Sequence, residues 1–234
     1  MAGTKSKKPG TFAKLYLVSY NLAQTLGWSY ILYLIVQHYI QPSSGSTLWD
    51  KTKLPVVVFQ NAALLEIIHA AIGIVRSNVI VTTFQVFSRV MLVVGVILAT
   101  PYTYAAASPG LPLALTAWSI TEIIRYSYYF ANIIGIVPNI LTWLRYTFFI
   151  GLYPLGVTGE LLCFYAAVKY ASVNPDSWSY VLPNKWNFTF SYLYFLIIIM
   201  LVYIPGFPQL YLHMFKQRSK IFSPDAAAKE KRTS

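Results

Sequence analysis

Charged side chains are scarce in this sequence. Asp, Glu, Lys and Arg make up 11% of the 234 residues, whereas an average soluble domain contains about 25%. Hydrophobic residues make up 56%. This balance excludes a disordered chain, which needs low hydrophobicity and high charge, and it argues strongly against a soluble globular enzyme. It favours a helical protein that crosses a membrane several times.

Cysteine, histidine and acidic residues are also few. The single cysteine, Cys163, excludes an internal disulfide and any site built from several cysteines. The histidines at positions 38, 69 and 213 are too scattered for a histidine-ligated metal centre. The 18 basic residues outnumber the 7 acidic ones. No basic stripe interleaved with aromatic residues accompanies this excess, so we expect no nucleic-acid partner.

Long hydrophobic runs are what the sequence has in abundance. Each run of about 20 or more residues can cross a hydrocarbon core of ~30 Å as an α-helix. Six such runs cover residues 15–40, 55–75, 79–100, 113–136, 140–168 and 190–215. We therefore predict an all-α polytopic membrane protein with six transmembrane helices. Pro55 suits the first turn of the second helix, and Pro205 and Pro208 favour a kink in the sixth.

The two ends of the chain are polar and basic. An even number of spans places both ends on one side of the membrane, and Lys and Arg concentrate on the cytosolic side. We therefore expect both termini to be cytosolic. The predicted organisation is a basic N-terminal segment at 1–14, a six-helix transmembrane domain at 15–215 and a basic tail at 216–234.

A few charged residues fall within the predicted helices, where each costs roughly 2.5–3.5 kcal/mol at the bilayer centre. Such groups face the bundle interior, pair with one another or serve a function. Glu122 and Arg125 lie three residues apart, so they can pair on one helix face. Arg89 can reach Glu66 on the adjacent helix. We interpret Glu66, Arg89 and Glu122 as structural ion-pairing residues. Arg145 serves either function or simple anchoring at the interface.

Glu160 is the remaining intramembrane charge, and it has no oppositely charged neighbour in sequence. Tyr153 lies seven residues earlier, close to two helical turns, so the two side chains share a helix face. Pro154 removes a backbone donor between them. Gly156 and Gly159 add backbone freedom or allow close helix approach. A carboxyl group and a phenol beside a locally opened helix suit acid–base catalysis. The alternative is a buried tyrosine and a paired glutamate.

Several segments together carry a resemblance to a known family. They are LLEIIHAAIGIVRS at 64–77, QVFSRV at 85–90, WSITEIIRYSYY at 118–129, LRYTFFIGLYPLGVTGELL at 144–162, LPNKWNFTF at 182–190 and YIPGFPQLYLHM at 203–214. From about Lys14 to Ile221 the sequence resembles the very-long-chain (3R)-3-hydroxyacyl-CoA dehydratases, also called the protein tyrosine phosphatase-like family.

The resemblance implies a six-span membrane enzyme of the endoplasmic reticulum. The implied reaction is the dehydration of (3R)-3-hydroxyacyl-CoA to trans-2-enoyl-CoA, the third step of very-long-chain fatty acid elongation. The implied partners are membrane lipid and the elongase condensing enzymes and reductases. The family's catalytic tyrosine and glutamate fall on Tyr153 and Glu160. We expect Glu160 to take the C2 proton and Tyr153 to assist the departing hydroxyl, without metal or redox cofactor, although the reverse assignment stays open.

Substrate binding is expected at Arg145, Arg125 and Gly156, with the two arginines directed at the CoA phosphates. One difficulty is depth. A helix that starts near Asn139 puts Tyr153 ~20 Å and Glu160 ~30 Å from its start. Either a water-filled cavity admits the pantetheine arm, or the helix begins nearer the site. The alternative function is a non-enzymatic membrane scaffold or lipid-binding protein of the same fold, which would not need both Tyr153 and Glu160.

Overall fold

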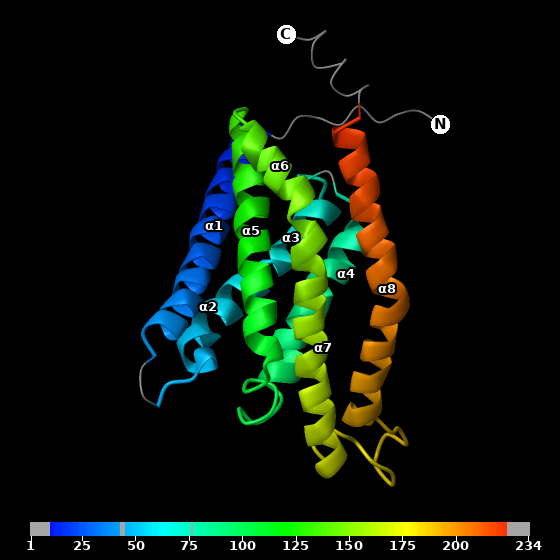
Figure 1. Cartoon of the computed structure of the whole chain (residues 1–234). Helices are drawn as coiled ribbons and strands as arrows, with labels where there is room; N and C mark the ends of the chain where they lie inside the picture. Colours follow the sequence, from blue (N-terminus) through cyan, green and yellow to red (C-terminus); the bar gives the residue numbers. More distant parts are fainter. Residues whose placement is uncertain (1–9, 43–44, 76, 224–234) are drawn as a thin grey trace, which may run out of the picture.

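The computed structural model describes residues 10–42, 45–75 and 77–223, and the regular elements of this part of the chain are helices. In order they are α1 (Thr11–Ile40), α2 (Leu48–Ala62), α3 (Leu64–Ala71), α4 (Val79–Val90), the π-helix η1 (Met91–Ile97), α5 (Gly110–Ile134), α6 (Asn139–Thr147), α7 (Phe149–Val173) and α8 (Tyr192–Ile221). Figure 1 shows the long helices side by side as one bundle. The all-α prediction is confirmed for the described residues.

Four helical stretches are long and apolar enough to cross a membrane: Leu48–Ala71, Val79–Ile97, Phe149–Val173 and Tyr192–Ile221. The first joins α2 to α3, and the second joins α4 to η1. Helices α1 and α5 have 30 and 25 residues but do not reach this apolar composition. Each carries buried polar residues, among them Gln24 in α1 and Glu122 in α5. The spans predicted at α1 and α5 therefore stay a prediction.

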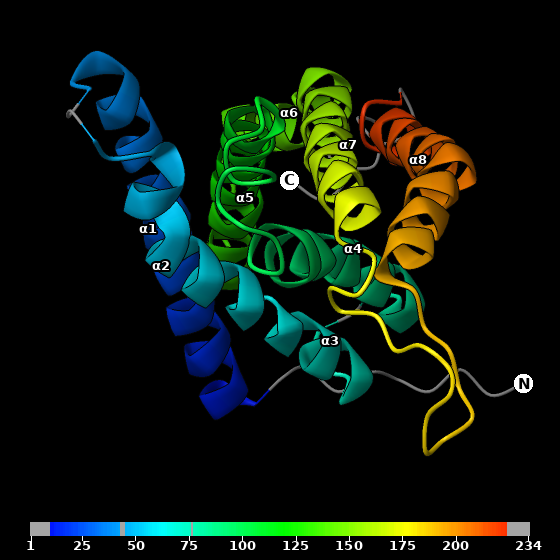
Figure 2. The same ribbon diagram turned by 90° about the horizontal axis from the view of Figure 1, so that it is seen from below.

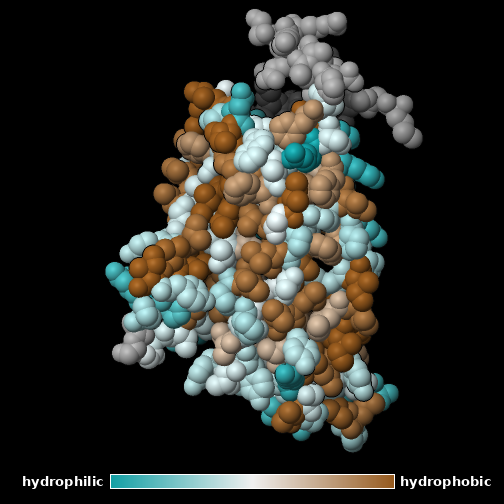
Figure 3. Space-filling model, in the orientation of Figure 1, coloured by the Kyte–Doolittle hydropathy of each residue, from teal (hydrophilic) through white to brown (hydrophobic). Residues whose placement is uncertain are grey.

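The outside of the bundle is apolar over much of its height. Figure 3 shows hydrophobic residues spread along the visible flank. Helix α8 contributes strongly, since it exposes Ile198, Leu201, Val202 and Ile204. A helix with an apolar outer face suits contact with lipid rather than with water.

The second predicted helix begins earlier than the sequence analysis placed it. Thr47 caps α2 by accepting a hydrogen bond from the Asp50 backbone, and the Asp50 carboxylate accepts one from the Thr47 backbone at 3.0 Å. This reciprocal pair is a capping box, a strong signal for a helix start. Pro55 therefore lies inside α2, and its predicted place in the first turn is wrong.

The fifth predicted helix is divided in two at Phe148, which separates α6 from α7. Tyr153 consequently lies only about 6 Å along the axis from the start of α7 at Phe149, at ~1.5 Å per residue. Helix α8 runs to Ile221, beyond the expected end at Phe215, and Pro205 and Pro208 lie inside it.

Helix α5 lies at the centre, packed against α1 on one side and α7 on the other. Its approach to α7 is very close, because a Cβ on Gly159 would lie 2.5 Å from the Ala114 nitrogen and 2.7 Å from the Gly110 oxygen. Small residues at such a crossing let two backbones come together. The crossing brings Trp118, one turn after Ala114, beside Glu160, the residue after Gly159.

The remaining helices enclose this crossing. Helix α3 packs on α4, and η1 packs on α7. Figure 2 shows α4 between α3 on one side and α5 and α7 on the other. The start of α1 and the end of α8 lie at the same end of the bundle, together with α6 (Figure 1).

Candidate active site

Glu160 lies in the bundle interior, where only 6% of it is exposed. Its Oε1 accepts a hydrogen bond from the Trp118 indole nitrogen at 2.9 Å, and its Oε2 accepts one from the Tyr203 hydroxyl at 2.6 Å. The donors come from α5 and α8, and both are uncharged. Within the described residues Glu160 makes no salt bridge. The carboxyl group is therefore held at both oxygens without a counter-ion.

Tyr153 lies near the start of α7, and its ring stacks on α8. The ring centroids of Phe207 and Tyr211 are 5.5 and 6.0 Å away, with interplanar angles of 15° and 3°. Its hydroxyl has no hydrogen bond to the described part of the chain. Tyr153 and Glu160 thus both contact α8. Tyr153 contacts Phe207 and Tyr211, and Glu160 contacts Tyr203. This leaves a phenol O–H and a carboxyl group on the same side of α7.

Pro154 lies inside α7 between these two residues and leaves one backbone carbonyl of the first turn without its helical partner. Proline has no backbone N–H, so the carbonyl of Ile150, four residues earlier, loses its helical donor. The Tyr211 hydroxyl supplies the missing hydrogen bond to this carbonyl at 2.8 Å. Helix α7 nevertheless continues through Pro154, so the local opening stays a prediction, and a side chain of α8 takes the place of the missing backbone donor.

Four other charged residues of the predicted helices form one network. Arg125 binds Glu66 through two hydrogen bonds of 2.5 and 2.8 Å, and it also binds Glu122, with its Nε 2.8 Å from Oε2. Arg89 binds the other oxygen of Glu122. Tyr126 donates its hydroxyl hydrogen to Glu66. Two carboxylates and two guanidinium groups from α3, α4 and α5 thus neutralise one another.

This network corrects one expected partner. The Glu122–Arg125 pair has the expected i, i+3 geometry. Arg89, however, pairs with Glu122 on α5 and not with Glu66, which Arg125 occupies. The reason is packing: α4 presents Arg89 to α5, and spacing within one helix cannot reveal such a neighbour. Two carboxylates engage Arg125, which leaves it poorly placed for CoA phosphates.

Arg145 has different surroundings from Arg125. Its guanidinium lies over the rings of Tyr128 and Tyr129, at 4.5 and 4.6 Å from their centroids, and it donates to the Tyr129 hydroxyl at 3.2 Å. Its buried Nη1 has no hydrogen-bond partner in the described part of the chain. Gly156 faces α5, since a Cβ there would lie 3.4 Å from the Ala117 Cβ. It therefore serves the helix crossing.

Sequence reasoning missed Trp118 and Tyr203 as partners of Glu160. Both are uncharged aromatic residues in a chain with 6 tryptophans and 19 tyrosines, so nothing in composition or spacing distinguishes them.

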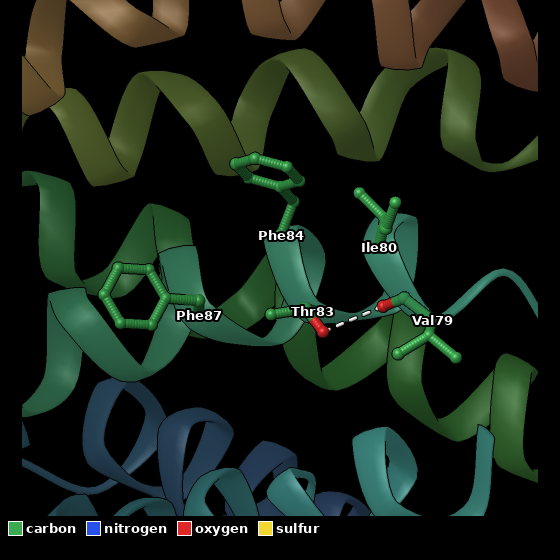
Figure 4. A pocket seen from close by; sticks show the side chains of 5 residues that line it. All are labelled: Val79, Ile80, Thr83, Phe84 and Phe87. Carbon is green, nitrogen blue, oxygen red and sulfur yellow. Dashed lines mark hydrogen bonds between the residues drawn. The ribbon is translucent and has the colours of Figure 1, made fainter. Parts of the chain in front are cut away.

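Two surface hollows of the described residues lie elsewhere, and neither is lined by a carboxyl group. One is on the outer face of α4, lined by Val79, Ile80, Thr83, Phe84 and Phe87, where Thr83 donates to its own helix at the Val79 carbonyl (Figure 4). Another lies between α7 and α8 and is lined mainly by aliphatic residues. Among the described residues, no three His, Cys, Asp or Glu side chains gather closely enough to hold a metal ion.

Residues 60–224 match the family model of the protein tyrosine phosphatase-like protein, PTPLA. The chain belongs to this family. The matched region runs from α2 to the end of α8 and includes Tyr153, Glu160, Trp118 and Tyr203. No solved structure matches the chain.

Relatives from this family carry dehydratase names. The chain is 48% identical to very-long-chain (3R)-3-hydroxyacyl-CoA dehydratase 2 of Mus musculus, over 94% of this chain and 85% of the relative. It is 39% identical to dehydratase 1 of the same organism, over 98% and 80%. It is 36% identical to the dehydratase PASTICCINO 2A of Oryza sativa subsp. japonica, over 92% and 96%.

Proposed function

We propose that this chain catalyses the dehydration of (3R)-3-hydroxyacyl-CoA to trans-2-enoyl-CoA, the third step of very-long-chain fatty acid elongation. The observation that carries the proposal is a buried carboxyl group without a counter-ion, beside a phenol on the same side of α7. The names of the relatives support both the reaction and the acyl-CoA substrate.

Glu160 and Tyr153 divide the acid–base work. The thioester acidifies C2, and the Glu160 carboxylate takes the C2 proton. The electrons of that C–H bond form the C2=C3 double bond, while the C3–O bond breaks. Tyr153 gives its proton to the departing hydroxyl, which leaves as water. A proton then returns from Glu160 to the Tyr153 oxygen and restores the enzyme. The reverse division of roles uses the same two groups.

Neutral donors suit this role of Glu160. A guanidinium partner would stabilise the charged carboxylate strongly and so oppose its protonation during turnover. Trp118 and Tyr203 orient both oxygens without adding a positive charge. The carboxyl group can therefore gain and lose a proton while its position stays fixed.

We place the active site in a six-span protein of the endoplasmic reticulum membrane, with both termini cytosolic. Support comes from the basic ends of the sequence and from the start of α1 and the end of α8, which lie at one end of the bundle (Figure 1). Helix α6 carries Arg145 at this same end. We assign Arg145 to the CoA phosphates, since it makes no salt bridge within the described residues.

The direction of the substrate follows from this placement. Tyr153 lies closer than Glu160 to the α6 end of α7. The charged CoA stays at that end, and the acyl chain extends toward the apolar body of the bundle. The enoyl product needs a reductase and the substrate needs a condensing enzyme with a ketoreductase. Elongase condensing enzymes and reductases are therefore the proposed partners.

Two substitutions test the proposal directly. Purified Tyr153→Phe and Glu160→Gln proteins should each lose about 10²- to 10⁴-fold in kcat, because each removes one acid–base group. The KM for a (3R)-3-hydroxyacyl-CoA should change little. Tyr165→Phe is a matched control, since Tyr165 is an exposed tyrosine of α7. Near-normal turnover in both site variants would refute the assignment of Tyr153 and Glu160 as the acid–base pair. Acyl-CoA binding without turnover by the unmodified protein would favour the scaffold alternative.

A further inference from the structure

Tyr203 on α8 makes the shortest hydrogen bond to the proposed catalytic carboxyl group. Its hydroxyl lies 2.6 Å from Glu160 Oε2, compared with 2.9 Å for the Trp118 nitrogen at Oε1. Its ring packs against Phe164 of α7, with centroids 5.9 Å apart and planes at 63°. Phe164 is fully buried. Both the ring and the hydroxyl of Tyr203 are therefore fixed relative to α7.

The two donors together set the orientation of the carboxyl group. With Trp118 alone, only Oε1 would be held, and the carboxyl group could still turn about the Cγ–Cδ bond and move Oε2. Tyr203 holds the second oxygen from the opposite helix, so the plane of the carboxyl group is determined. A displacement of about 1 Å at a reacting group can cost about 10²-fold in rate. The Tyr203 hydroxyl restricts this rotation of the Glu160 carboxyl group, so its removal should lower kcat more than it changes substrate binding.

We propose that Tyr203 is a positioning residue for Glu160, acting through its hydrogen bond to Oε2. The inference rests on the proposed function, because it assigns Tyr203 a task only if Glu160 exchanges a proton with substrate. The family's acid–base pair accounts for Tyr153 and Glu160 and leaves the Tyr203 phenol without a role.

Helix α8 does not need the Tyr203 hydroxyl to dock on the bundle. Tyr192 donates to the Gly95 carbonyl at 2.6 Å, and Tyr211 donates to the Ile150 carbonyl at 2.8 Å. Arg218 donates to the Tyr146 carbonyl and to the Thr147 hydroxyl at 2.9 and 2.6 Å. Tyr203→Phe keeps the ring against Phe164 and removes only the hydroxyl. This variant should therefore fold.

The experiment compares Tyr203→Phe with Tyr194→Phe in purified protein, using (3R)-3-hydroxyacyl-CoA in detergent micelles. Tyr194 is an exposed tyrosine of the same helix, so its variant should behave like the unmodified protein. We expect Tyr203→Phe to lower kcat by about 10- to 100-fold, with KM changed less than threefold. Tyr203→His retains a ring N–H donor and should keep more of the kcat than Tyr203→Phe.

A double variant separates positioning through Glu160 from an independent role. If Tyr203 acts through Glu160, the Tyr203→Phe/Glu160→Gln protein should be no slower than Glu160→Gln alone. The inference would be overturned if the kcat of the double variant fell below that of Glu160→Gln by the same factor by which Tyr203→Phe alone lowers kcat. An unchanged kcat in Tyr203→Phe would also overturn it, as would loss of folded protein in both Tyr203 variants while Tyr194→Phe folds. Retained activity in Glu160→Gln would instead refute the proposed function, which makes the two failures distinguishable.

Discussion

Two carboxylates lie buried in the same bundle with opposite kinds of partner. Glu122 is held by the guanidinium groups of Arg89 and Arg125. Glu160 is held by the neutral donors Trp118 and Tyr203. Both carboxylates have each oxygen satisfied, so burial and hydrogen bonding do not distinguish them. The charge of the partner does.

The difference separates a structural role from a reactive one. Glu66, Glu122, Arg89 and Arg125 sum to zero charge, and each is fixed in its charged state by the others. Such a closed network resists any change of protonation. Glu160 makes no salt bridge to this network among the described residues, and its two hydrogen-bond donors are uncharged groups that orient the carboxyl group without fixing its charge. An intramembrane carboxyl group without a counter-ion is therefore the better candidate for chemistry.

The largest expected effect tests the structural side of this comparison. Glu122→Gln leaves Arg89 and Arg125 facing each other without their shared carboxylate. Removal of one partner from a buried ion pair costs about 3–5 kcal/mol. We expect the free energy of unfolding, measured by loss of helical circular dichroism in micelles, to fall by about that amount.

Glu160→Gln is the matched control for that measurement. The glutamine oxygen can still accept a hydrogen bond from Trp118 or Tyr203, so unfolding should shift by less than about 1 kcal/mol. Equal destabilisation by the two substitutions would remove the distinction between the two carboxylates.

A smaller effect tests the helix crossing that brings Trp118 to Glu160. Gly159→Ala places a Cβ 2.5 Å from the Ala114 nitrogen, so α5 and α7 must separate. Overpacking of this kind costs about 1–3 kcal/mol, and kcat should fall because the Trp118 donor moves away. Gly151→Ala on the same helix is the control, since its Cβ meets nothing within 4 Å. Equal melting curves and equal kcat values for the two variants would contradict the role of this crossing.

The smallest effect extends the comparison to the arginines. Arg125 is engaged by carboxylates, whereas Arg145 lies among tyrosine rings with its Nη1 unpartnered in the described residues. If Arg145 contacts CoA phosphates, Arg145→Gln should raise KM about tenfold, equivalent to about 1.4 kcal/mol. The kcat should stay near that of the unmodified protein. An acyl-pantetheine substrate, which lacks the nucleotide phosphates, should show no such change in KM. An equal rise for both substrates would argue against the phosphate contact.

Much of this architecture follows from local patterns in the sequence. The hydrophobic runs predict the helices, and the i, i+3 spacing predicts the Glu122–Arg125 pair. The seven-residue spacing predicts that Tyr153 and Glu160 face one side of α7. Each of these features belongs to a single helix, so the helical period of 3.6 residues per turn is enough to predict it.

What the sequence did not reveal depends on contacts between helices. The partner of Arg89 is set by how α4 meets α5, and the donors of Glu160 come from α5 and α8. Two tyrosines of equal chemistry, such as Tyr203 and Tyr194, differ only in which way α8 turns them. The start of α2 is a different case, because the Thr47–Asp50 capping box is a local pattern that the sequence itself contains.

Pro154 has a consequence for how much the chain can change in length. Because Pro154 has no N–H, the Ile150 carbonyl of α7 accepts a hydrogen bond from Tyr211 of α8 instead. Tyr203 of α8 donates a second hydrogen bond to α7, at Glu160. These two hydrogen bonds fix the register of α8 against α7 at points about 12 Å apart along α8. One inserted or deleted residue between 203 and 211 would rotate one tyrosine by about 100° relative to the other. The segment 203–211 can therefore vary in its lipid-facing side chains, whereas its length is constrained.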